Sequence, residues 1–262
     1  MYRNNLIIIA LFLILSSFAS AQTQTFVVVP NEYTNTEGPN PSGLVFDCNP
    51  FARPNGQRYQ QVYLNSQIGD RTLEIIGINF RSEEEQDEVM PVVIPTVQID
   101  MSITQTQPDN LVATFANNLG PIVTTVYSGP VTVDVPACGA GPCPFAVKIP
   151  LQTPFMYNPS EGNLIVDIRV PDCMRTFVDM DASQLNLSET SNVFTTSVEG
   201  VDDPDANEFL LNDGGFVTQF DIILPPPTIT PIPTLSEWGL MAMAGILGIV
   251  GYLVIRRRKL MA

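Results

Sequence analysis

Short stretches with strand-like patterns follow one another between the two strongly apolar ends of this chain. Polar and apolar residues alternate at positions 97–103, 131–135 and 166–170. Alternation with a period of two predicts strands that have one buried face and one face in water. Further apolar runs of strand length occupy residues 26–29, 73–80, 122–127, 145–149 and 216–224.

The segments between these runs favour turns, and helical periodicity is scarce away from the two ends. Asn55-Gly56 and the sequence Ser-Glu-Gly-Asn at 160–163 are typical turn sequences. The chain has 23 prolines, which interrupt helices and are tolerated at turns and strand edges. We therefore predict an all-β fold in which residues 22–224 form one antiparallel β-sandwich.

The N-terminal apolar end has the three parts of a secretory signal peptide. Arg3 supplies a positive charge, residues 6–15 are apolar without interruption, and Ala19-Ser20-Ala21 forms a small-residue cleavage site. The apolar run is shorter than the ~20 residues that a membrane span needs. We expect residues 1–21 to be removed, so that the exported chain begins at Gln22.

The C-terminal apolar end is long enough to cross a membrane. Residues 238–255 contain no charge and span roughly 27 Å as a helix, close to the thickness of a bilayer core. Four basic residues follow directly: Arg256, Arg257, Arg258 and Lys259. The positive-inside rule leaves these residues in the cytoplasm and places the ectodomain outside the cell.

A specific motif stands immediately before this helix. Its eight residues are Ile232, Pro233, Thr234, Leu235, Ser236, Glu237, Trp238 and Gly239. The motif, the helix and the basic tail together resemble the IPTL-CTERM sorting signal over residues 232–262. The resemblance implies recognition and processing by an exosortase, a membrane enzyme that acts near the motif.

Two weaker features belong to the exported part. The segments 58–63, 114–118, 127–130 and 154–164 together resemble a recurring β domain of secreted proteins with PEP-CTERM-type tails, a resemblance that implies an extracellular β domain and no activity. The proline-rich residues 225–231 predict a semi-rigid polyproline spacer between the domain and the motif.

Charge and cysteines agree with export. The formal net charge is −15, and the part between the two apolar ends carries 7 basic against 27 acidic residues, which disfavours binding to nucleic acid or to anionic lipid. All four cysteines lie in this part, where disulfides form. The short, glycine-rich loop between Cys138 and Cys143 favours their pairing, which leaves Cys48 to pair with Cys173.

The chain contains no histidine, which removes the usual Ser-His-Asp, Cys-His and zinc-hydrolase sites. No cofactor is indicated. A calcium site is a weak candidate because Asp202, Asp203, Asp205 and Glu208 are close together, although their spacing does not fit an EF-hand loop.

We expect a non-enzymatic component of the cell surface or extracellular matrix that is first held in the cytoplasmic membrane. One alternative is a carbohydrate-binding module that recognises polysaccharide through exposed aromatic side chains. Its candidates are Tyr59, Tyr63, Tyr127 and Tyr157. The other alternative is a glycoside hydrolase with a pair of carboxylates, for which the sequence selects no pair.

Overall fold

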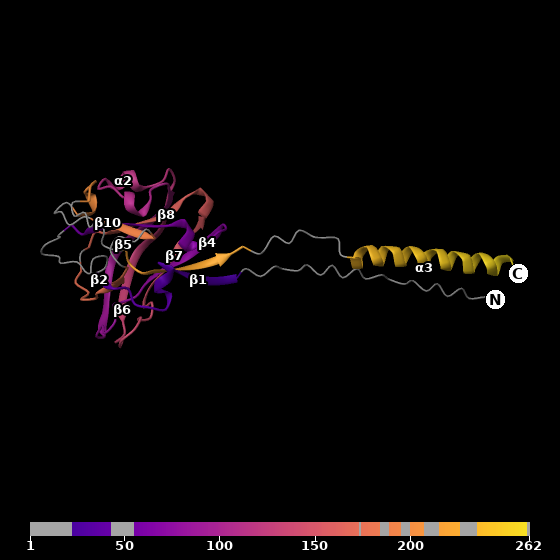
Figure 1. The fold of residues 1–262 in the computed structure, drawn as a ribbon, viewed down its shortest axis with the longest axis horizontal. Coiled ribbons are helices and arrows are strands. Elements are labelled where there is room, and N and C mark those ends of the chain that lie inside the picture. Colours follow the sequence, from indigo (N-terminus) through magenta and orange to yellow (C-terminus); the bar gives the residue numbers. More distant parts are fainter. Residues whose placement is uncertain are drawn as a thin grey trace. The chain divides into compact units, whose positions relative to one another are not determined.

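The computed structural model describes residues 23–42, 55–172, 174–183, 189–194, 200–206, 215–225 and 235–260. The chain divides into two compact units, Met1–Pro225 and Pro226–Ala262. The first unit contains the strands, and the second contains the long helix α3 (Leu235–Leu260), as Figure 1 shows.

Two antiparallel sheets make up most of the first unit. The four-stranded sheet has the order β1 (Thr23–Val29), β11 (Thr218–Leu224), β4 (Leu73–Phe80) and β7 (Val147–Tyr157). The five-stranded sheet has the order β10 (Thr190–Phe194), β3 (Gln57–Tyr63), β8 (Asn163–Val170), β5 (Val89–Thr104) and β6 (Val123–Val135). The short strands β2 (Asn40–Ser42) and β9 (Met180–Ala182) pair with each other.

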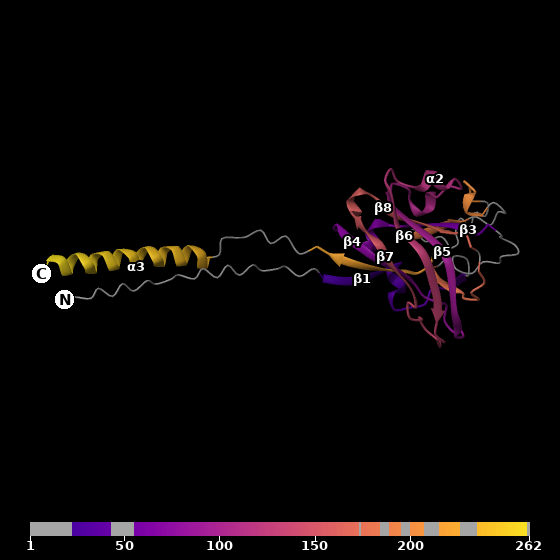
Figure 2. The ribbon, with the colours of Figure 1, turned by 180° about the vertical axis from the view of Figure 1, so that it is seen from behind.

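The inner faces of the two large sheets share one hydrophobic core. Alternate residues of β8, such as Val166 and Ile168, are buried in this core with Ile75 and Ile78 of β4. The ring of Tyr63 on β3 meets the ring of Phe220 on β11 edge to face, with centroids 5.0 Å apart. This contact between strands of different sheets confirms the predicted antiparallel sandwich, whose strands are seen from behind in Figure 2.

Short helical turns connect the strands. They are η1 (Asn31–Thr34), α1 (Asn65–Ile68), η2 (Pro108–Asn110), α2 (Phe115–Asn118), η3 (Pro159–Glu161) and η4 (Gly200–Asp202). Residues 105–120, which include η2 and α2, form a lobe: Leu111 and Phe115 pack with Val62 and Ile165 in a second, smaller core. Both Val62 and Ile165 lie on strands of the five-stranded sheet, so the lobe covers part of that sheet's outer face.

Prolines explain two of the three places where the pairing of β5 with β6 is interrupted. The register between β5 and β6 shifts between Val89 and Val92, between Ile94 and Val97, and at Ile99/Asp100, where there is no proline. The first two shifts enclose Pro91 and Pro95, which have no backbone N–H to donate to the neighbouring strand.

The strand predictions hold for the apolar and alternating segments. The predicted segments 122–127 and 131–135, expected as separate strands, fall within the single strand β6 except for Ile122, which directly precedes it. Strand β3 was not among the strands predicted from the pattern, because its residues Gln60 and Gln61 are polar yet fully buried.

Candidate functional site

Helix α3 has the composition and length of a membrane span. Its 26 residues extend ~39 Å, and residues 239–259 are apolar enough to cross a bilayer. No part of the apolar stretch is buried inside the protein. Arg257, Arg258 and Lys259 lie in the last turn, where positive charge favours the helix terminus.

The sorting motif overlaps the start of helix α3 along the chain. Leu235, Trp238 and Gly239 belong to the first turns of α3. Ile232, Pro233 and Thr234 lie outside the described residues. The second half of the motif is therefore continuous with the apolar helix.

Comparison with known families identifies this tail. Residues 230–259 match the family model of the IPTL-CTERM motif. The IPTL-CTERM segment is thus a C-terminal sorting signal of an exported protein, and its apolar helix fits anchorage in a membrane. No curated protein and no solved structure matches the chain. The family match covers the tail alone and assigns no role to the sandwich.

The aromatic residues proposed for carbohydrate binding do not form an exposed platform, which corrects that expectation. Tyr59, Tyr63 and Tyr157 are at most 4% exposed and lie in the core between the sheets. Tyr127 is half-buried, and its hydroxyl donates a hydrogen bond to the carbonyl of Pro130. The rings of Tyr59, Tyr63 and Tyr157 provide buried apolar area and are closed to a sugar, and the single half-buried Tyr127 does not make a platform.

The disulfide between Cys138 and Cys143 is present, as the glycine-rich loop predicts. Cys143 is buried, whereas Cys138 is partly exposed. Cys48 and Cys173 lie outside the described residues, so their pairing stays a prediction. The loop closed by the disulfide contacts the segment after β4, because the N–H of Gly141 donates to the carboxylate of Glu84 over 2.8 Å.

The candidate calcium loop is described in part. Asp202 ends η4, and the side chain of Asp203 accepts a hydrogen bond from the N–H of Asp205 over 3.0 Å. Glu208 lies outside the described residues. The calcium hypothesis for this loop therefore stays a prediction.

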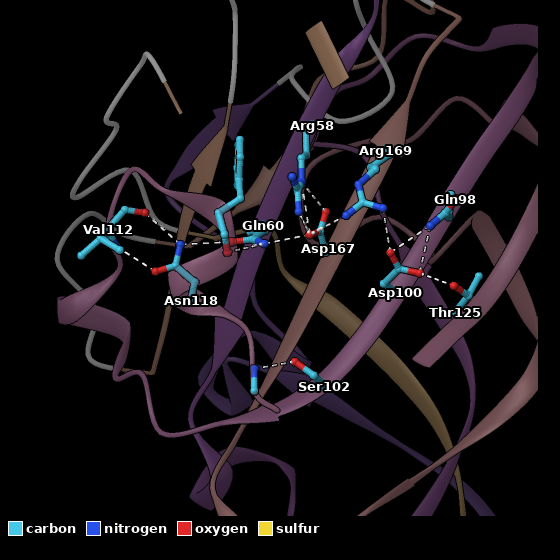
Figure 3. A network of polar contacts seen from close by, with 12 residues as sticks. Arg58, Gln60, Gln98, Asp100, Ser102, Val112, Asn118, Thr125, Asp167 and Arg169 are labelled. Atoms are coloured by element: carbon cyan, nitrogen blue, oxygen red, sulfur yellow. Dashed lines mark hydrogen bonds and ion pairs between the residues drawn. The ribbon is translucent and has the colours of Figure 1, made fainter. Parts of the chain in front are cut away.

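A network of charged and amide side chains crosses the outer face of the five-stranded sheet (Figure 3). The carboxylate of Asp167 is fully buried and accepts hydrogen bonds from Nε of Arg58 over 3.0 Å and from Nε2 of Gln60 over 2.8 Å. Arg169 joins this group to Asp100, with an Nη1 to Oδ2 distance of 3.0 Å. Two arginines and two aspartates therefore neutralise one another.

The same network holds the lobe of residues 105–120 against the sheet. The side chain of Asn118 donates to Oε1 of Gln60 over 3.1 Å and to the carbonyl of Val112 over 2.8 Å. The guanidinium of Arg58 lies 4.5 Å from the ring centre of Phe115. Because each of these polar groups is engaged within the protein, the network stabilises the fold and offers no free group to a substrate.

A second polar group was not predicted from the sequence. Glu37, Glu83 and Asp181 each bring a carboxylate oxygen within 4.8 Å of the others, and this is the one such group of three acids in the described part of the chain. Burial, followed by the negative charge of Asp181, raises the pKa of Glu37 to about 7. The same causes raise the pKa of Glu83 to about 7. Burial also raises the pKa of Asp181, against the opposing effect of Arg81.

An apolar cavity of about 500 Å³ lies at the strands β6 and β7. Pro121, Ile122, Phe155 and Met156 form most of its wall. Ile122 and Met156 are strongly exposed. Its polar groups come from Gln105, Thr124 and Glu161, and only one of these is an acid, which falls short of the two that a glycoside hydrolase needs.

Proposed function

We propose that this protein is a non-enzymatic exported component of the cell surface or extracellular matrix, delivered through processing of its IPTL-CTERM segment by an exosortase-like membrane enzyme. The observation that carries the proposal is the family match of residues 230–259, in which the motif joins an apolar helix that ends in basic residues. In this function the tail is the substrate of another enzyme, and the sandwich is the cargo.

The physical roles of the parts follow from their chemistry. The apolar helix holds the chain in the bilayer, and the basic residues fix the cytoplasmic side by the positive-inside rule. Trp238, at the opposite end of the span, suits the membrane interface. A membrane enzyme then meets the motif at the outer boundary, where cutting frees the ectodomain or transfers it to an acceptor.

The proposed route of export also includes the predicted removal of residues 1–21. It leaves the sandwich attached to the membrane through its C-terminal end alone. The two chain ends of the sandwich are neighbours, because Thr23 of β1 pairs with Leu224 of β11. Cutting near the motif would consequently leave a sandwich whose first and last strands still hold each other by a complete register of seven residue pairs.

Mass spectrometry of the intact protein from the native envelope and from the medium tests the proposal. We expect a mature species that begins at Gln22 and ends near Thr234. Replacing Pro233, Thr234 and Trp238 by Ala should abolish this species and leave the full tail attached. The matched control is Ser236→Ala, at a variable position of the motif, which should be processed normally.

Two results would contradict the proposal. One is an intact basic tail on the natural protein in its own envelope. The other is the same shortened species in the natural protein and in the triple variant, because an unrelated protease would then make the cut.

A further inference from the structure

The acidic trio of Glu37, Glu83 and Asp181 joins three segments that are far apart in the sequence. Glu37 follows η1, Glu83 follows β4 and Asp181 lies in β9. The disulfide loop contributes a fourth segment, because the Sγ atom of Cys143 lies 3.1 Å from the carbonyl oxygen of Glu83. The trio therefore lies where several connections of the sandwich meet.

Two carboxylate oxygens in this trio have no partner. Oε1 of Glu37 accepts a hydrogen bond from the N–H of Glu84 over 3.0 Å, but its Oε2 is buried and accepts none. Oε2 of Glu83 is likewise buried and accepts none. A buried carboxylate oxygen without a donor costs free energy, so these two atoms indicate a missing positively charged or proton-bearing partner.

The nearby arginine does not fill this role. Nε of Arg81 donates to Oδ2 of Asp181 over 2.6 Å. Its Nη2 donates to the carbonyls of Tyr33 and Thr36 over 2.9 Å and 2.6 Å. Arg81 is thus committed to Asp181 and to the backbone. The other charged groups close to the trio, Glu84 and Asp179, are negative.

We propose that Glu37, Glu83 and Asp181 bind a calcium ion that links the segment after η1, the segment after β4 and strand β9. Calcium oxygen distances are ~2.3–2.6 Å, so two ligands of one ion lie at most about 5 Å apart. The limit of 4.8 Å between the three ligand oxygens fits this geometry. The ion gives a partner to each unpaired oxygen of Glu37 and Glu83.

Calcium is favoured over other metals by the donor set. All three ligands are carboxylates, the hard oxygen donors that Ca²⁺ takes in flexible geometry. Zinc prefers nitrogen and sulfur donors, whereas the chain has no histidine, and Cys143 is already in a disulfide. Mg²⁺ demands a nearly ideal octahedron and retains several waters, which suits a partly closed site less well.

Calorimetric unfolding of the full-length protein in detergent tests the site, first without divalent cations and then with 10 mM calcium at about pH 7.5. Extracellular calcium sites have dissociation constants of roughly 0.1–1 mM. A site in this range predicts a rise in Tm of about 3–10 °C. The double variant E37Q/E83Q, which keeps the side-chain shapes and removes two charges, should lose this rise.

Two control variants separate the trio from general charge effects. Glu85→Gln removes an exposed acid from the same segment as Glu83, and its calcium response should equal that of the natural protein. Asp203→Asn alters the other acidic loop and should also respond normally. Isothermal titration with calcium should show the dissociation constant weakened at least ~10-fold in E37Q/E83Q alone.

Three outcomes would overturn the proposal. The first is no rise in Tm with calcium in the natural protein. The second is an equal rise in E37Q/E83Q or with magnesium, which would indicate screening of surface charge. The third is loss of the response in Asp203→Asn with E37Q/E83Q unaffected, which would place the ion in the other loop.

Discussion

Replacing Asp167 by Asn should destabilise the sandwich more than any surface substitution of an acid. Asp167 is fully buried, and it is the shared acceptor of Arg58 and Gln60 in Figure 3. Asn keeps the shape and one acceptor but removes the charge. Arg58, whose side chain is 11% exposed, then stays buried without its counter-ion.

The expected cost follows from this burial. Removing one partner of a buried ion pair costs about 3–5 kcal/mol, because the other charge is left uncompensated. Since Asn retains an acceptor, we expect the lower end, about 3 kcal/mol. A domain of this size loses roughly 2–4 °C in Tm for each kcal/mol, which gives a decrease of about 6–12 °C.

Differential scanning calorimetry of the full-length protein is the suitable assay. The chain has one tryptophan, Trp238 in α3, so tryptophan fluorescence would report on the tail and not on the sandwich. Amide hydrogen exchange adds a local readout: α2 should exchange faster in the variant, because the network holds the lobe of residues 105–120. Asp109→Asn, an exposed acid in the same lobe, is the matched control and should change stability by less than about 0.5 kcal/mol.

A loss below about 1 kcal/mol for Asp167→Asn would refute this reasoning. It would mean that Arg58 gains enough from water or from Gln60 to replace its ion pair. Arg169 provides a comparison, because its side chain is 29% exposed and can reach water. Arg169→Ala should therefore cost less than Asp167→Asn in the same assay.

Three further predictions concern other parts of the sandwich. Replacing Cys138 and Cys143 by Ser should cost about 2 kcal/mol in urea unfolding, because the disulfide closes a loop of only a few residues; a loss above 5 kcal/mol would exclude this explanation. Without divalent cations, the free energy of unfolding should fall by about 1–2 kcal/mol from pH 5 to pH 8, less than the pKa shifts alone would give, because both side chains are half-buried and water screens their charges. The raised pKa values of Glu37 and Glu83 give this sign: the protonated forms stabilise the fold, and their contribution disappears as the pH rises through about 7, so E37Q/E83Q should flatten the profile. Gly56→Ala should cost more than about 1 kcal/mol in urea unfolding, because Gly56 has φ +76° and a Cβ would lie 1.9 Å from a backbone oxygen; a neutral result would show that the turn adapts.

Much of the sandwich follows from patterns that are local in the sequence. Alternation at 97–103 and 166–170 is set by one buried and one outward face, and both segments lie within strands of the five-stranded sheet. The alternation rule does not predict strand β3, because its polar residues are buried as well as its apolar residues. Gln60 and Gln61 can be buried there only because each finds hydrogen-bond partners more than 50 residues away. Which residues become these partners depends on the fold, so the local sequence pattern does not reveal them.

The candidate sites also differ in whether their signal is local in the sequence. The sorting motif is contiguous, and its recognition depends on eight neighbouring residues, so the sequence alone suffices to find it. The acidic trio is spread over Glu37, Glu83 and Asp181. Its only local signal is the segment 83–88, five acids and one glutamine, a composition that is typical of an exposed loop. Glu84 and Glu85 are indeed exposed, whereas the Oε2 atom of Glu83 is buried. Burial of one acid within a run depends on the segments that pack over it.

Three ion pairs remove equal numbers of positive and negative charges, so the part between the two apolar ends keeps its excess of 20 acids, with 4 basic residues left against 24 acids. Arg58, Arg81 and Arg169 are three of the seven basic residues in the exported part, and each is paired with an aspartate. The positive charges of these arginines are balanced within the fold by Asp167, Asp181 and Asp100. This excess of acids has few cations to offset it, so neighbouring copies displayed together, as proposed above, would repel each other unless divalent ions are present. Calcium at the trio would therefore act in the same direction as calcium in the surrounding medium, because both lower the negative charge of the displayed domain.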